Sequence, residues 1–169
     1  MADTHVETYL NDHLAGSKAA LELLEHLEVA HAGTEIGRLA AEILADVAAD
    51  RQELEALMDR LGISQRRTRK ATAWLAAKVT ELRLRLEDRA GGALHLLESL
   101  EALSLGIEGK RSLWQALAAA ADGEPALQVA DYDRLARRAE EQRRRVEEKR
   151  LEAAREALVP TAEPSPAIA

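Results

Sequence analysis

The stretch TEIGRLAAEILADVAADRQELEALMDRLGI, residues 34–63, decides the fold class. At about 100° per residue its large apolar side chains share one stripe of a helix. These are Ile36, Leu39, Ile43, Val47, Leu54, Leu57 and Leu61. Thr34 is a suitable N-cap, and Gly62 suits the left-handed position that ends a helix. The stretch therefore predicts a long amphipathic helix whose stripe other helices must cover.

The same periodicity recurs on both sides of this helix. It predicts a first helix over residues 5–31, a third helix from Ser64 to the glycines at 91–92, and a last, strongly charged helix over 131–158. The segment between the third and last helices carries Gly106 and Gly109, which should break or kink it. Because the connections are short, consecutive helices should be antiparallel neighbours.

We therefore predict an all-α fold, an up-down-up-down antiparallel bundle with a broken fourth helix. The long charged C-terminal helix is an additional element outside this bundle, and its thin apolar seam suits a homodimer or a protein partner. Residues 1–158 form a single helical-bundle domain. Residues 159–169 contain three of the chain's four prolines and form a disordered tail.

Composition supports this fold class and narrows the classes of function. Hydrophobic residues make up 47% of the 169 residues, yet aromatic residues are only 2% and Phe is absent, which favours helices over sheets. The net charge of −7 argues against nucleic acid as a partner, and the absence of cysteine excludes thiolate chemistry and disulfides. Without a signal peptide or a membrane span, we expect a soluble, cytoplasmic protein.

Three ionisable residues lie on the apolar stripes of the first three helices: His13, Asp50 and Lys78. Short turns would bring all three to one height in the bundle, where a carboxylate between a lysine and a histidine stays ionised. Several neighbours would complete this buried polar cluster: Tyr9, Ser17, Ser104, Gly106 and Gly109. The wall at residues 105–110 would be irregular backbone, and the end at Lys110 could attract an anion. The cluster is either a ligand pocket or a structural ion pair that fixes helix register.

Other chemistry finds less support in the sequence. A di-iron carboxylate bundle needs two Glu-x-x-His pairs, and the chain has one such spacing that points inward, Glu28 with His31. Those two residues are the candidate metal ligands, although nothing in the sequence requires a cofactor. No nucleophile elbow, phosphate-binding loop or dinucleotide motif is present, so the sequence does not indicate an enzyme.

Two segments together carry a family resemblance: YLNDHLAGS at residues 9–17 and LGIEGKRSLW at 105–114. They resemble a family of small, uncharacterised bacterial all-helical proteins that are ferritin-like in shape. The resemblance covers most of residues 9–158 and implies a helical bundle. Ferritins use a long crossover where this chain has a short turn, so no metal ligands are carried over.

We consider three functions. The first is a non-catalytic structural or interaction module. The second is a ferritin-like bundle that binds a metal or a small ligand. The third is a small-anion binder at the level of His13, Asp50 and Lys78.

Overall fold

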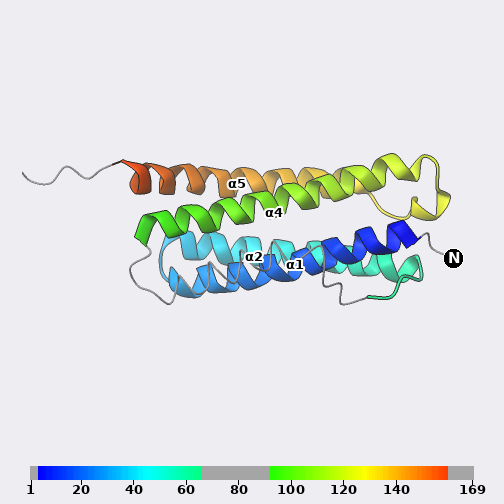
Figure 1. Ribbon diagram of the computed structural model, residues 1–169, viewed down its shortest axis with the longest axis horizontal. Coiled ribbons are helices and arrows are strands. Elements are labelled where there is room, and N and C mark those ends of the chain that lie inside the picture. Colours follow the sequence, from blue (N-terminus) through cyan, green and yellow to red (C-terminus); the bar gives the residue numbers. More distant parts are fainter. Residues whose placement is uncertain (1–3, 66–91, 160–169) are drawn as a thin grey trace, which may run out of the picture.

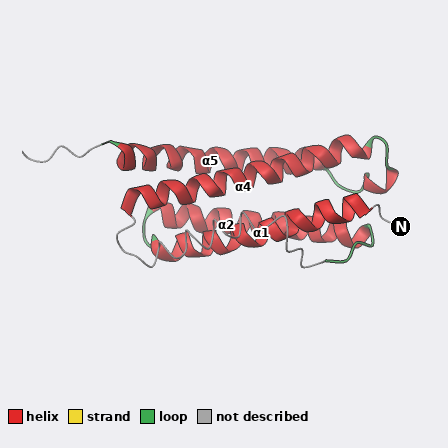
Figure 2. Ribbon diagram, in the orientation of Figure 1, coloured by secondary structure: helices red, strands yellow, loops and turns green. Residues whose placement is uncertain are grey.

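A computed structural model describes residues 4–65 and 92–159 of the chain, and within these ranges the secondary structure is helical, without strands (Figures 1 and 2). Four long helices account for most of it: α1 (Thr4–Ala30), α2 (Glu35–Arg60), α4 (Gly92–Ala121) and α5 (Tyr132–Leu158). A short 3-10 turn, Pro125–Leu127, lies between α4 and α5. The predicted all-α class is confirmed.

The ends of α2 follow from the sequence signals that predicted them. The Thr34 hydroxyl accepts a hydrogen bond from the Gly37 amide at 3.2 Å, so Thr34 is the N-cap. Gly62 has a φ of 66°, and the amide of Ile63 then donates to the Met58 carbonyl at 2.9 Å. This left-handed turn buries Ile63 against the core, as a C-terminal capping motif should.

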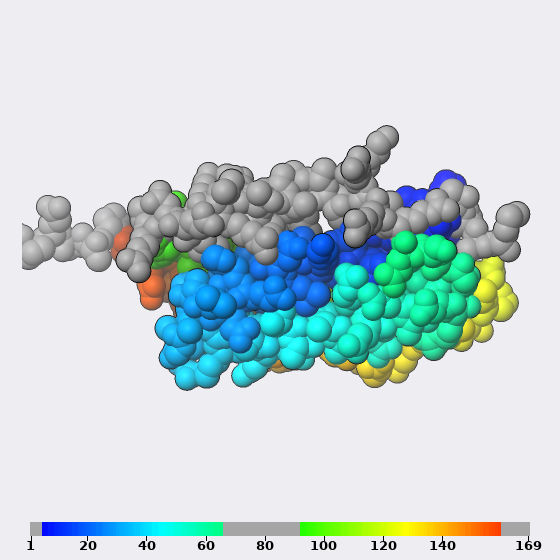
Figure 3. Space-filling view, turned by 90° about the horizontal axis from the view of Figure 1, so that it is seen from below, coloured from blue at the N-terminus to red at the C-terminus, as the bar shows by residue number. Residues whose placement is uncertain are grey.

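The four helices form two antiparallel hairpins that face each other (Figure 1). The first hairpin joins α1 to α2, which lie side by side along the face shown in Figure 3. The second joins α4 to α5. Across the two hairpins, α1 contacts α4 and α2 contacts α5. The predicted third helix, over 64–91, lies almost entirely outside the described residues, so the up-down-up-down topology stays a prediction.

The prediction of a broken fourth helix is wrong. α4 runs without interruption for 30 residues through Gly106 and Gly109. Two mid-helix glycines cost about 2 kcal/mol relative to alanine. Buried side chains on both sides of them, such as Leu103 and Trp114, hold the helix against the rest of the bundle and offset that cost.

The prediction that the charged C-terminal helix lies outside the bundle is also wrong. The apolar seam of α5 is buried, with Leu135, Ala139, Val146 and Ala153 at most 3% exposed. Its charges meet opposite charges on α2 in an antiparallel ladder. The pairs are Glu53 with Arg134, Asp50 with Arg138, Glu42 and Asp46 with Arg145, and Glu35 with Lys149. A mostly charged helix thus packs inside because its partner carries complementary charges.

The hydrophobic core is divided into two clusters along the bundle axis. One contains residues such as Leu24, Ile43 and Leu103, and the other contains residues such as Leu14, Leu57 and Leu117. Between them every described helix contributes polar side chains, which we call the polar layer: Ser17, Asp50, Arg51, Lys110, Arg138 and Gln142. The candidate site lies at this layer.

Candidate functional site

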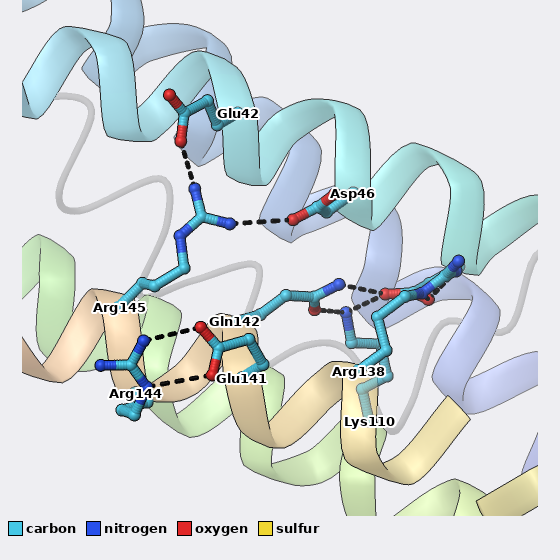
Figure 4. Close-up of polar contacts among 9 residues, drawn as sticks. Glu42, Asp46, Lys110, Arg138, Glu141, Gln142, Arg144 and Arg145 are labelled. Atoms are coloured by element: carbon cyan, nitrogen blue, oxygen red, sulfur yellow. Dashed lines mark hydrogen bonds and ion pairs between the residues drawn. The ribbon is translucent and has the colours of Figure 1, made fainter. Parts of the chain in front are cut away.

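Asp50 is the centre of the polar layer. Its side chain is 1% exposed, and both carboxylate oxygens are occupied. Oδ1 accepts two hydrogen bonds from the Arg138 guanidinium, one of them from Nε at 2.6 Å. Oδ2 accepts one from the Lys110 ammonium and one from Gln142 Nε2 at 2.9 Å (Figure 4). Four hydrogen bonds saturate the carboxylate, which explains how the bundle tolerates its burial.

The hydrogen-bonding capacity of Lys110 is less fully used than that of Asp50. Its ammonium donates to Asp50 and to Gln142 Oε1, which occupies two of its three N–H groups. The third N–H has no hydrogen-bond partner among the described residues. Burial lowers the pKa of Lys110 and the nearby Arg138 lowers it further, whereas Asp50 and Asp46 oppose the shift.

A cavity of about 310 Å³ adjoins this network, lined by α1, α2 and α4. Its polar lining consists of Asp12, His13, Ser17, Asp50, Arg51 and Lys110. The remainder of its wall is apolar and includes Leu54, Ile107 and Trp114. The cavity thus offers an apolar volume beside a buried ion network.

Arg51 bridges α1 and α2 at the wall of the cavity. Its Nη1 donates to the Leu14 carbonyl at 2.9 Å and to the Ser17 hydroxyl at 2.8 Å, and its Nε pairs with Glu55. The Ser17 hydroxyl in turn donates to the Leu14 carbonyl at 2.6 Å. Arg51 and Ser17 are therefore committed to holding two helices together.

His13 is a neutral group on the same wall. Burial lowers its pKa from 6.5, and the nearby Asp12 opposes that shift. The ring of Tyr9 packs edge-on against the imidazole, with ring centroids 4.7 Å apart. Above pH 6.5, His13 therefore contributes polar surface to the cavity without adding charge.

Two glycines of α4 enlarge the cavity. Gly106 and Gly109 line it, neither has a positive φ, and a Cβ atom added to either would meet no atom of the described residues within 4 Å. Neither a left-handed backbone nor close packing against residues 4–65 and 92–159 therefore requires glycine here. By contrast, Gly37 of α2 is required by packing, because a Cβ atom there would clash with the His31 carbonyl.

The structure places most of the predicted cluster around this one cavity: His13, Ser17, Asp50, Gly106 and Gly109 line it. Tyr9 is 38% exposed and contacts the cavity only through His13. Ser104 is buried but donates to Glu147 of α5. Lys78 lies outside the described residues. The predicted irregular backbone at 105–110 is wrong, because these residues are helical.

Sequence reasoning missed Arg138 and Gln142, and it gave Lys110 the wrong role. The sequence pattern predicts Lys110 at the end of a broken helix, whereas its side chain reaches Asp50. The sequence does contain a signal for the packing of α5. Acidic residues along α2 and basic residues along α5 pair in opposite chain order, which is the pattern of an antiparallel charge ladder.

The metal and partner predictions find no added support. No group of three potential metal ligands occurs in the described ranges, so Glu28 and His31 lack a third ligand there. The α5 seam that suggested a homodimer or a protein partner is buried within the chain itself. None of the described helices is long and apolar enough to cross a bilayer.

Comparison with protein-family models, curated proteins and solved structures gives no significant match. The resemblance to a ferritin-like family therefore stays a prediction.

Proposed function

We propose that this protein binds a small, largely apolar molecule in the cavity between α1, α2 and α4. The volume of about 310 Å³ lies at the lower end of the range found for ligand pockets. Its wall, mostly apolar with a few buried polar groups, is typical of such pockets. Leu105 lines the cavity and is 58% exposed, which supports an entrance at this residue.

The glycines at 106 and 109 are the observation that carries this proposal. Each weakens α4 by about 1 kcal/mol relative to alanine, and an alanine would fit at either position without contact. A bundle optimised only for stability would fill this space, because cavities in a core are destabilising. The glycines are therefore explained by a molecule that occupies the space they leave.

Thermal unfolding with 1-octanol and indole as probes tests the proposal. A ligand present at 100 times its Kd adds about 2.7 kcal/mol of stability. For a chain of this size that corresponds to a rise in Tm of about 5–10 °C. Isothermal titration calorimetry then gives the stoichiometry, which should be one molecule per chain.

A variant that fills the cavity identifies the site. Gly109→Leu should abolish the rise in Tm because its side chain occupies the ligand's volume. Ala116→Leu is the matched control, since it adds a leucine at an exposed position of the same helix and should leave the rise intact. The proposal is wrong if neither probe raises the Tm, or if Gly109→Leu binds as the wild type does.

A further inference from the structure

One hydrogen-bond donor on the cavity wall has an N–H group without a partner among the described residues. It is the third N–H of Lys110, whose side chain is 14% exposed. The indole Nε1 of Trp114 also lacks a partner there, but that atom is fully buried and does not open onto the cavity. Partly buried charged donors without partners are uncommon and destabilising, so the free N–H of Lys110 needs an explanation.

Lys110 lines the cavity, so a ligand in the cavity lies beside its side chain. A ligand group with an acceptor oxygen can take a hydrogen bond from the ammonium.

The charges around Lys110 favour an anion as the source of that oxygen. Two cations, Lys110 and Arg138, face the single buried carboxylate of Asp50, whose acceptor sites are all occupied. Burial lowers the pKa of Lys110, and a second negative charge beside the ammonium would oppose that shift as Asp50 and Asp46 do. Asp12 is the other carboxylate of the wall, and it is partly exposed.

We infer that the ligand is a monocarboxylate with an apolar body, held at its head group by Lys110 Nζ. This inference rests on the proposed function, since it assigns the chemical class of the molecule that the cavity takes. The apolar body would lie along the wall formed by residues such as Leu54 and Ile107, where Gly106 and Gly109 leave room.

Three probes with the same chain and different head groups test the inference: octanoate, 1-octanol and octylammonium. Calorimetry at pH 7 should show octanoate binding at least tenfold more tightly than octanol, which is the effect of one charge-assisted hydrogen bond. Octylammonium should bind most weakly, because its charge would face Lys110.

Variants separate the head group from the cavity. Lys110→Met should bring octanoate to within about threefold of octanol without abolishing octanol binding. Lys18→Met is the control for removal of a lysine, since Lys18 is 73% exposed and pairs only loosely with Glu22, and it should leave the preference unchanged. Lys110→Gln removes the charge while it keeps a polar side chain beside Asp50, and it should weaken octanoate more than octanol even if Lys110→Met fails to fold.

The outcomes distinguish the two proposals. If none of the probes binds, the proposed function itself is wrong. If octanol and octanoate bind equally, if octylammonium binds best, or if both folded variants keep the full preference for octanoate, the cavity binds ligands but the carboxylate assignment is overturned.

Discussion

Replacing Gly106 and Gly109 by alanine should stabilise this protein while weakening ligand binding. Both glycines lie inside α4, and an added Cβ atom at either would contact nothing within 4 Å, so no strain opposes the change. The gain in helix propensity is about 1 kcal/mol at each position, or about 2 kcal/mol for the double variant. For a chain of this size that corresponds to a rise in Tm of about 4–8 °C.

Urea unfolding followed by circular dichroism measures this gain as a shift of the midpoint at an unchanged m-value. Calorimetry with 1-octanol then measures the loss of affinity that the two added methyl groups cause. Gly37→Ala is the matched control, because its Cβ atom would clash with the His31 carbonyl, and it should destabilise the protein. If the double variant is less stable than the wild type, the space beside α4 is not empty and the reasoning fails.

Three further predictions concern the stability of the polar layer and its surroundings. Asp50→Ala should lower the free energy of unfolding, measured with urea, by about 3 kcal/mol. This is the lower end of the range for a broken buried ion pair, because the partly exposed Arg138 can relax into water. A loss below about 1 kcal/mol would show that the cluster is solvated. Burial lowers the pKa of His13 below 6.5, so the unfolded chain binds a proton more readily than the folded one. Stability should therefore decline as the pH falls through 6.5, and His13→Gln should flatten that part of a Tm-against-pH profile; an equal slope in both proteins would exclude His13 as the cause. Asn11→Ala should cost about 1–2 kcal/mol in the same urea assay, because the Asn11 amide donates to the Ser64 carbonyl at 3.2 Å; an unchanged midpoint would refute a structural role for that bond.

Local sequence signals predicted the helices well wherever those signals determine the structure. The stretch 34–63 has a cap, an apolar stripe and a left-handed glycine in register, and α2 follows it nearly residue for residue. His13 and Asp50 line the same cavity, as a short turn between α1 and α2 leads one to expect, but Lys110, Arg138 and Gln142 rather than His13 occupy the Asp50 carboxylate. Periodicity and turn chemistry suffice for features of this kind.

The placement of α5 could not be predicted in this way. Most residues of α5 are charged or polar, and from periodicity alone such a helix is expected to be exposed to solvent. What places it in the bundle is a relation between two helices, the charge ladder from Glu53 with Arg134 to Glu35 with Lys149. A pairing of this kind becomes visible only when two distant segments are compared in antiparallel register.

The prediction that α4 is broken failed for a related reason. Gly106 and Gly109 break a helix only if nothing else holds it, and helix propensity is a weak prior against the packing of residues such as Leu103 and Leu113. Tertiary contacts on both sides of the glycines decided the outcome. The sequence therefore showed the local weakness correctly but not what compensates for it.

Two features that lower the stability of a core, a buried ion network and glycines inside a helix, lie at one level of this bundle. A buried ion network centred on Asp50 could fix the register of the helices without any cavity beside it, and glycines in α4 could be tolerated at any height. Sequences usually violate the rules of stability at sites that serve another purpose. Lys110 connects the two features, because it binds Asp50 in the ion network and lines the cavity beside Gly109. The proposed binding site would account for both features, whereas an ion network among the described residues accounts only for the buried charges.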